Sequence, residues 1–198
     1  WSMLKLTPSH VDLLTATWAN EDKKGVCNCL ILGGEALSYS SILPWREYAP
    51  KTRIVNEYGP TETVVGCAVY EEKKSAASAS GAVSASGAVP IGKPIWNTQL
   101  FGLDESKNPL PPGIEGERYI GGDGVAKGYL HRDELTKERF ISLQETGLSA
   151  YNIAPAESRL YATGDRVKLQ FDGDLVFLGR SDSQVKLRGY RIEIAEVE

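Results

Sequence analysis

The sequence has few of the residues on which several common kinds of protein depend. It contains three cysteines, two histidines and one methionine in 198 residues. No apolar run approaches the roughly 20 residues of a bilayer span, and no secretory signal pattern opens the chain. Lys and Arg number 22 against 26 Asp and Glu, so the net charge is −4. This balance argues against nucleic acid or an anionic membrane as the main partner. The few cysteines, taken as reduced, lead us to expect a cytoplasmic protein.

The cysteines do not form a metal-binding or disulfide pattern. Cys27 and Cys29 have C-x-C spacing in the apolar run CNCLIL, and Cys67 stands apart. A metal site would need more Cys or His nearby, but His10 and His131 are the only histidines. We therefore interpret the cysteines as reduced structural residues, and the sequence offers no Ser-His-Asp set.

Apolar residues are nevertheless plentiful, and their spacing predicts an α/β layer in the first half. Hydrophobic residues make up 41% and charged residues 24%, as in an ordinary globular chain. A helix is expected to start near Ser9, with Val11, Leu14 and Trp18 on one face. The other elements expected here are a buried strand at 27–32, a short helix at 40–48 limited by Pro44, a strand ending at 54–55 and a strand at 64–70.

The second half is predicted to be mostly β. Residues 74–89 are rich in Ala, Ser and Gly, which predicts a flexible surface loop without a function of its own. Short strands are expected at 117–120, 160–163, 166–171 and 175–178, with one helix at 133–140. Asp172-Gly173 predicts a hairpin turn. The fold class is thus mixed α/β, a sheet and helix layer followed by a small antiparallel barrel or sheet.

The run NEYGPTET at 56–63 is a polar turn that follows a predicted strand. An exposed Tyr58 could stack on a nucleobase, Thr61 could hydrogen-bond a phosphate, and Glu62 could hold Mg²⁺. An Asx-type turn with a surface tyrosine explains the composition equally well.

Two further polar clusters follow glycines. Asp165 in YATGDRV could accept from both hydroxyls of a ribose, although a hairpin aspartate is the simpler reading of this motif alone. The run GRSDSQVKLRGYRIE at 179–193 could bind phosphate or carboxylate, or form a solvated strand face. Its basic residues are Arg180, Lys186, Arg188 and Arg191.

Four runs in order, NEYGPTE, GERYIGGDGVAKGYL, YATGD and GRSDSQVKLRGYRIE, resemble the adenylation domains of nonribosomal peptide synthetases, within the adenylate-forming superfamily. The resemblance implies that residues 1–179 are the later part of the large subdomain, and 180–198 the hinge and first strands of the small C-terminal subdomain. The sequence departs from the family pattern at Ala162, where arginine is usual, and at Arg118, where an apolar residue is usual. The chain is expected to be an internal fragment.

The resemblance implies a role for each motif residue. Tyr58 would stack on adenine, with the Gly34 backbone on the other face and Asn56 bonded to the adenine amino group. Thr61 would contact the α-phosphate, and Glu62 would coordinate Mg²⁺.

The later motifs complete this implied site. Asp165 would hold the ribose hydroxyls with help from Arg180, and Asp182 would be the hinge. ATP and Mg²⁺ are the implied cofactors. The implied partners are an amino acid, a carrier domain with its phosphopantetheine, and a condensation domain. Because the phosphate loop, the aspartate for the substrate amino group and the C-terminal lysine are expected outside residues 1–198, we expect the chain alone to be inactive.

By the same resemblance, six positions would line the side-chain pocket for the amino acid. Lys5 and Glu57 would offer a donor and an acceptor, which suits a carboxamide, so asparagine is predicted, with glutamine second. A salt bridge between Lys5 and Glu57 at a strand edge is the alternative. The six positions are Lys5, Ile31, Gly33, Glu57, Val65 and Gly66.

Two other functions remain open at the level of sequence. An acyl- or aryl-CoA ligase of the same superfamily shares the Tyr-Gly-x-Thr-Glu logic. A non-catalytic nucleotide-binding remnant is also compatible, although the presence of Thr61, Glu62 and Asp165 argues against it.

Overall fold

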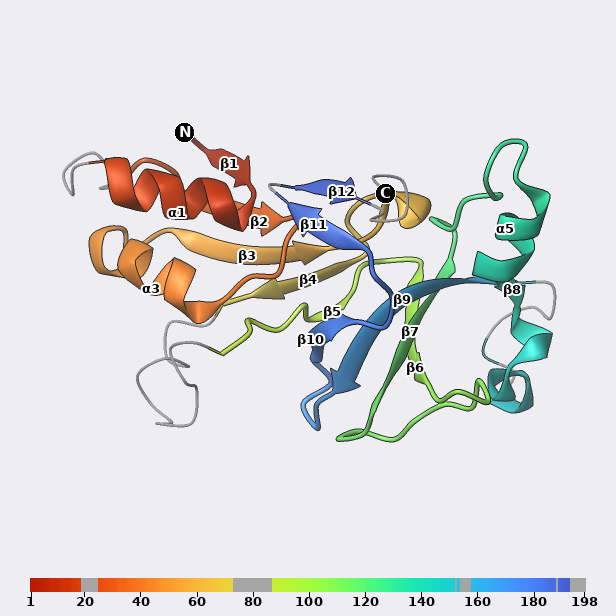
Figure 1. Ribbon diagram of the computed structural model, residues 1–198. Helices are drawn as coiled ribbons and strands as arrows, with labels where there is room; N and C mark the ends of the chain where they lie inside the picture. The colour runs from red at the N-terminus through yellow and green to blue at the C-terminus, as the bar shows by residue number, and fades with distance from the viewer. Residues whose placement is uncertain (19–24, 73–86, 152, 154–157, 188, 193–198) are drawn as a thin grey trace. The chain divides into compact units, whose positions relative to one another are not determined.

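A computed structural model describes residues 1–18, 25–72, 87–151, 153, 158–187 and 189–192 (Figure 1). The chain divides into two compact units. Unit 1 comprises Trp1–Glu57, Val69–Ile91 and Ser183–Glu198, and unit 2 comprises Tyr58–Ala68 and Gly92–Asp182.

Unit 1 is built on a sheet in which the order of strands begins β1-β2-β3-β4. The first three strands are parallel, because a helix follows each of the first two and returns the chain to the same edge. The elements are β1 (Met3–Leu6), α1 (Pro8–Thr17), β2 (Cys29–Gly33), α3 (Tyr39–Tyr48), β3 (Arg53–Tyr58) and β4 (Ala68–Glu71). The predicted α/β layer is confirmed.

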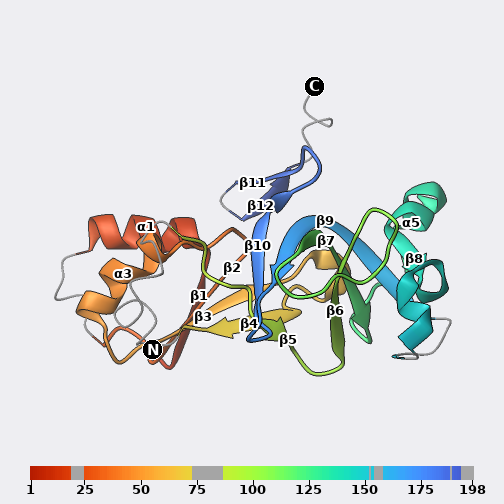
Figure 2. The ribbon, with the colours of Figure 1, turned by 90° about the horizontal axis from the view of Figure 1, so that it is seen from below.

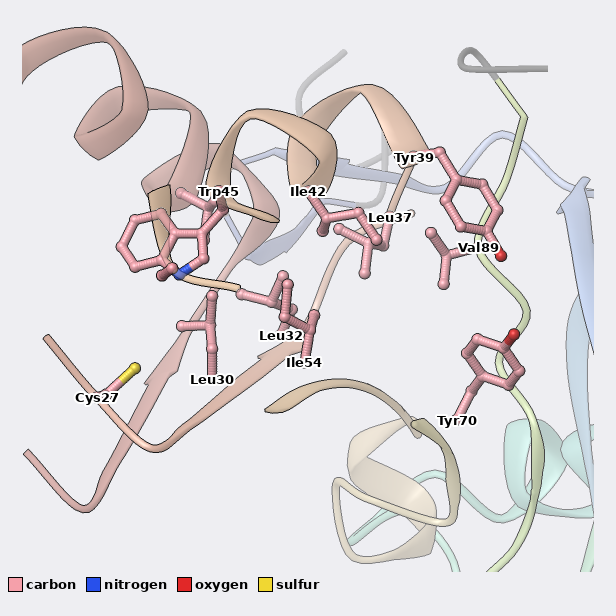
Figure 3. Close-up of a cluster of buried hydrophobic side chains, with 12 residues drawn as sticks. Cys27, Leu30, Leu32, Leu37, Tyr39, Ile42, Trp45, Ile54, Tyr70 and Val89 are labelled. Atoms are coloured by element: carbon pink, nitrogen blue, oxygen red, sulfur yellow. The ribbon is translucent and has the colours of Figure 1, made fainter. Parts of the chain in front are cut away.

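The core of unit 1 lies between the strands and the helices. Leu30, Leu32 and Ile54 alternate along β2 and β3 and are fully buried. Ile42 and Trp45 of α3 point toward them, as Figure 3 shows. Burial of each such side chain contributes about 1.5–3 kcal/mol to folding. This packing stabilises the sheet, and with it the positions of the residues on its opposite face.

Both helices differ in detail from the prediction. Thr7 is the N-cap of α1 and Pro8 occupies its first position, so the helix starts before Ser9. Pro44 lies inside α3 and does not limit it. Ile42 and Trp45 are almost fully buried on either side of this proline, and their packing outweighs the backbone hydrogen bond that proline removes.

The strand predicted at 64–70 begins only at Ala68. Val64 and Val65 have left-handed backbones, with φ of 67° and 70°. The Cys67 amide donates to the Tyr58 carbonyl at 2.8 Å and closes the turn that Gly59-Pro60 starts. Turn closure therefore overrides the β-propensity of these valines.

Unit 2 is built on an antiparallel sheet in the order β10-β9-β7-β6, with β8 paired to β9 (Figure 2). The second half was predicted to be a barrel or a sheet, and it contains this sheet. Its strands are β6 (Thr98–Leu103), β7 (Glu115–Gly122), β8 (Phe140–Ser142), β9 (Arg159–Leu169) and β10 (Leu175–Arg180). The short elements are β5 (Lys93–Pro94), η1 (Thr61–Thr63), α5 (Asp133–Arg139), η2 (Leu143–Glu145) and η3 (Gly147–Tyr151).

β9 is one strand where two were predicted. Gly164, expected to separate them, has φ of 71° but lies within the strand. The hairpin is confirmed, but its loop has three residues, 171–173, in place of the two-residue turn predicted at Asp172-Gly173. The Gln170 amide donates to the Asp174 carbonyl at 2.8 Å, the Gly173 amide donates to the Gln170 carbonyl at 3.0 Å, and Gly173 has φ of 86°.

The predicted loop at 74–89 falls largely outside the described residues. Its end is described, and there Val89 is 2% exposed and belongs to the core of unit 1, so the surface-loop prediction is wrong at this end. In unit 1, β11 (Val185–Leu187) pairs with β12 (Tyr190–Ile192). No helix within the described part of the chain is long and apolar enough to span a bilayer.

Candidate functional site

The strongest polar cluster of unit 2 surrounds Asp165. We call Tyr58, Arg118, Asp165, Arg180 and Asp182 the Asp165 cluster. The Tyr58 hydroxyl donates to Asp165 Oδ2, although 107 residues separate the two. Tyr58 is only 9% exposed, so the prediction of an exposed tyrosine is wrong. Its ring is covered by Arg118, whose guanidinium carbon lies 3.3 Å from the ring centroid.

Local backbone geometry places Asp165. It lies within β9 and not in a hairpin turn, so the hairpin-aspartate alternative is wrong. A Cβ at Gly164 would lie 2.8 Å from Asp182 Oδ2 and 2.9 Å from Arg180 Nη2, and its φ is left-handed. The left-handed backbone favours glycine at this position, and a larger side chain would also displace the ends of Asp182 and Arg180. The Asp165 amide donates to Thr163 Oγ1 at 3.0 Å, which fixes the bend.

Asp165 is 2% exposed and bonded to two arginines. Arg180 Nη1 donates to its Oδ1 at 2.6 Å, and Arg118 Nη2 lies 3.4 Å from its Oδ2. Arg180 also binds Asp182 with both ends of its fork, at 2.6 Å each. The structure thus brings together three predicted site residues, Asp165, Arg180 and Asp182, in one network of ion pairs. Within it, Arg180 binds Asp182 through two parallel hydrogen bonds.

Arg118 was noted in the sequence only as a departure from a family pattern. It is fully buried on β7, and burial together with the charge of Arg180 lowers its pKa well below the usual value. An arginine inside the otherwise apolar strand pattern of RYI was the available signal, and the partner Tyr58 could not be read from it.

A second polar group surrounds Glu62. Its side chain is buried, and Tyr129 donates to Oε1 at 2.6 Å. The hydroxyls of Tyr129 and Tyr161 are 3.5 Å apart. Burial and the hydrogen bond to Glu62 raise the pKa of Tyr129, so it remains a donor. Sequence reasoning missed both tyrosines, although Tyr129 lies in the quoted run GERYIGGDGVAKGYL.

The donor set around Glu62 fits a magnesium ion held largely by a substrate. Thr61 is exposed beside the buried carboxylate in η1. Among the described residues, no group of three or more His, Cys, Asp or Glu could hold a metal ion. Mg²⁺ is commonly bound by one or two protein carboxylates together with substrate phosphates. Glu62 can supply the carboxylate of such a site, and Thr61 adds a hydroxyl beside it.

In unit 1, four predicted pocket positions share one face of the sheet. Lys5 lies opposite Ile31, and Gly33 opposite Glu57, at alternate positions of neighbouring strands. Lys5 Nζ lies 2.5 Å from Glu57 Oε2, so the predicted salt-bridge alternative is realised in this structure. A Cβ at Gly33 would lie 2.7 Å from the Glu57 carbonyl oxygen, so the strands require glycine there.

The remaining pocket positions belong to unit 2. Val65 is 56% exposed with a left-handed backbone, and Gly66 is half-buried. Their exposure is compatible with contact to a ligand.

Two residues of unit 1, Gly34 and Asn56, were predicted to contact adenine. Gly34 follows β2 with φ of 85°. Asn56 is 3% exposed, and its Nδ2 donates to the Pro90 carbonyl at 2.8 Å and the Val89 carbonyl at 3.3 Å. Its Oδ1 is the atom that can accept from an amino group.

The other predicted positions contribute less. Lys186 is exposed in β11, while Arg188 and the side chain of Arg191 lie outside the described residues. The cysteines are free thiols, and burial raises the pKa of Cys27.

Comparison with known proteins places this geometry in a family. The model of the family described as AMP-binding enzyme matches residues 2–130. The chain is 46% identical over 197 residues to bacitracin synthase 3 of Bacillus licheniformis and 41% identical over 197 residues to tyrocidine synthase 3 of Brevibacillus parabrevis. Each alignment covers 99% of this chain and 3% of the relative, so the chain spans a small part of those proteins.

Solved structures give the same answer. Holo-PA1221, an NRPS protein containing adenylation and PCP domains bound to a vinylsulfonamide inhibitor, matches with a TM-score of 0.84 and 30% identity over 100% of this chain and 32% of that chain. NpsA-ThdA, an artificially fused adenylation-PCP di-domain NRPS from Klebsiella oxytoca, matches with a TM-score of 0.82 and 28% identity over 100% and 33%. The chain therefore has part of the fold of these adenylation proteins and belongs to the AMP-binding enzyme family.

Proposed function

We propose that the protein containing this chain activates an amino acid with ATP, giving an aminoacyl adenylate and pyrophosphate. The observation that carries the proposal is the Asp165 cluster, in which Tyr58 and Arg180, from separate motifs, both contact Asp165. An aromatic ring beside a buried carboxylate and guanidinium groups suits the base, the diol and the charge of a nucleotide. Family membership supports the same assignment.

In this proposal, Tyr58 stacks on adenine with the Gly34 backbone on the other face, and Asn56 accepts from the amino group. Asp165 accepts from the ribose hydroxyls, with Arg180 beside it. Because Asp165 already accepts from Tyr58 and Arg180, the ribose competes with these donors, and the Tyr58 hydroxyl is the neutral one that gives way most cheaply.

The phosphates lie by Thr61 and Glu62. A carboxylate oxygen of the amino acid attacks the α-phosphorus, and the bond from this phosphorus to the bridging oxygen of pyrophosphate breaks. Thr61 contacts the α-phosphate through its exposed hydroxyl, and Glu62 holds Mg²⁺, which when bound neutralises phosphate charge. Positioning of this kind is the main source of catalysis in phosphoryl and adenylyl transfer.

Asp182 would be the hinge of the C-terminal subdomain. It accepts both ends of the Arg180 fork and also lies 3.8 Å from Arg139 Nη2. Rotation about this residue would therefore alter the ion pairs that hold Arg180.

We further propose asparagine as the amino acid. Lys5 and Glu57 lie on one face of the sheet, beside Ile31 and the side-chain-free Gly33. A carboxamide can insert between the charges, its oxygen accepting from Lys5 and its NH₂ donating to Glu57. An aspartate would place its carboxylate against Glu57, and this like-charge contact disfavours it. Glutamine is the second choice, and Val65 and Gly66 would complete the pocket.

The adenylate would then pass its acyl group to a carrier-domain thiol, with release of AMP. PA1221 and the NpsA-ThdA fusion both contain adenylation and PCP domains, which supports a carrier domain with phosphopantetheine as partner. A condensation domain of the same synthetase is the expected next partner.

Amino-acid-dependent pyrophosphate exchange by the complete protein tests the proposal. Asparagine should rank among the best of the proteinogenic amino acids, and exchange should require Mg²⁺. Exchange with acyl or aryl acids alone would indicate a ligase of the CoA type, and ATP binding without any exchange would indicate a non-catalytic module.

A matched pair of variants tests the site itself. Asp165→Asn should raise the KM for ATP about tenfold or more, because a neutral amide accepts less strongly from the ribose. Asp172→Asn, at an exposed hairpin aspartate, should leave the KM unchanged. Equal KM values for the two variants would contradict the role of Asp165.

A further inference from the structure

Arg118 occupies an environment that a side chain selected for stability alone would avoid. It is 0% exposed on β7. Among the described residues, its Nε and Nη1 have no hydrogen-bond partner, and Nη2 is 3.4 Å from Asp165 Oδ2. A second cation, Arg180, binds the same carboxylate. Burying a guanidinium with two unsatisfied nitrogens is costly, and an apolar side chain of similar volume is often as stable or more so.

The contacts of Arg118 are with two residues that the proposed function assigns to the nucleotide. Its guanidinium carbon lies 3.3 Å from the centroid of the Tyr58 ring, which is a close cation–π contact. The guanidinium covers one face of that ring, so a base can stack only on the other. The Thr163 hydroxyl donates to the Arg118 carbonyl at 2.8 Å, which fixes this part of β7 against the strand that carries Asp165.

The nearby departure at Ala162 does not take over this task. Ala162 pairs with Tyr119 in the sheet and belongs to a hydrophobic cluster with it. Successive side chains of a strand face opposite ways, so Arg118 and Ala162 lie on opposite faces. The cation beside Tyr58 is therefore supplied by Arg118 and not by position 162.

We propose that Arg118 is a positioning residue for the nucleoside: it braces one face of Tyr58 and shares the charge of Asp165 with Arg180. The inference rests on the proposed function and extends it to Arg118, a residue to which the family resemblance assigns no role. Bracing fixes the ring before the base arrives, so less side-chain freedom is lost on binding. Sharing of Asp165 keeps the carboxylate oriented when the Tyr58 hydroxyl leaves it for the ribose.

The test uses Arg118→Met and Arg118→Lys in the complete protein. Arg118→Met should raise the KM for ATP about tenfold, with kcat changed by less than about threefold and the KM for the amino acid unchanged. Its free energy of unfolding in urea should stay equal or rise, because a buried charge is removed. Arg118→Lys keeps the charge but not the planar contact, so its KM for ATP should rise about threefold.

A ribose readout separates positioning from mere structure. The ratio of kcat/KM for ATP to that for 2′-deoxy-ATP reports how well Asp165 engages the diol, and it should fall in both variants. Arg166→Met, at an exposed arginine of the same sheet, is the matched control and should change neither quantity.

The outcomes are distinct. A KM for ATP within about twofold of the wild type in both variants, with an unchanged ribose ratio, overturns the inference. So does an equal rise in the KM for ATP and for the amino acid. If the methionine variant does not fold, the lysine variant decides by the same criteria. If the wild-type protein catalyses pyrophosphate exchange with none of the amino acids tested, the proposed function fails instead.

Discussion

The hydroxyl of Tyr129 donates a 2.6 Å hydrogen bond to Oε1 of Glu62, across 67 residues of sequence. Phe140 packs edge-on against the Tyr129 ring, with centroids 5.4 Å apart. The phenol is thus held in place by packing, and it fixes the direction of a buried carboxylate. A carboxylate fixed in this way is prepared for a cation in a manner that a free side chain is not.

Tyr129→Phe is therefore expected to weaken both folding and cation binding. The ring packing survives, but the hydrogen bond to a charged group, worth about 1.5–3 kcal/mol, is lost. The Mg²⁺ concentration for half-maximal pyrophosphate exchange should rise severalfold. Urea unfolding and a Mg²⁺ titration measure the two effects. Tyr151→Phe, at a tyrosine that is 65% exposed, is the control, and equal Mg²⁺ requirements in the two variants would contradict the assignment.

Two neighbouring glutamates, Glu71 at the end of β4 and Glu72 directly after it, should differ sharply in their contribution to stability. Arg46 Nε donates to Glu72 Oε2 at 2.7 Å, with both side chains largely buried. Arg53 binds Glu71 at 2.8 Å, with both side chains at least half exposed. Arg46→Met should cost about 3–5 kcal/mol because it leaves a buried carboxylate uncompensated. Arg53→Met should cost less than about 1 kcal/mol.

The double variant Arg46→Met/Glu72→Met completes this comparison. Removal of both charges should restore most of the loss, since two apolar side chains can replace a buried pair. Chemical unfolding of four proteins, the wild type, Arg46→Met, Glu72→Met and the double variant, gives the coupling energy between Arg46 and Glu72. A double variant as unstable as Arg46→Met alone would show that Arg46 acts mainly through its other contact, the Thr52 carbonyl.

The sequence predicted the order of elements well because hydrophobic periodicity and glycine position are local. It placed the buried strand at 27–32, the hairpin at Asp172-Gly173 and the helix from Asp133 within a few residues. It misplaced Val64 and Val65, because their conformation is set by turn closure and not by propensity. Pro44 was expected to limit its helix, but the helix continues past it because the neighbouring residues Ile42 and Trp45 are packed in the core.

Prediction of the site was uneven in the same physical sense. Asp165 and Arg180 were identified by motif, but the burial of Tyr58 depends on Arg118, which comes from another strand. Tyr129 was missed because its partner Glu62 is distant in sequence. Pairing between strands decides such contacts, and no periodicity reports it.

Stability should decline at high pH partly through Tyr119. Burial, reinforced by the charge of Glu117, raises the pKa of Tyr119 to about 12 from 10.0. The unfolded chain therefore releases this proton first, and the stability that the neutral phenol provides is complete below about pH 10 and lost as pH rises to about 12. In urea unfolding, the free-energy difference between the wild type and Tyr119→Phe should shrink by at most about 1.4 kcal/mol per pH unit over that window. A difference that stays constant across it would contradict the shifted pKa.

Glu57→Ala should separate the pocket role of Glu57 from its salt bridge with Lys5. If Glu57 accepts from a carboxamide, kcat/KM for asparagine should fall by the equivalent of about 1–3 kcal/mol, because the amide donors lose their acceptor. The preference for asparagine over aspartate should shrink as well, since the repelling carboxylate is gone. Glu71→Ala, at an exposed glutamate on β4, should change neither value. If the salt bridge serves only the sheet, Glu57→Ala would instead lower the free energy of unfolding and leave the asparagine-to-aspartate ratio unchanged. Exchange assays with both amino acids, alongside urea unfolding, distinguish these outcomes.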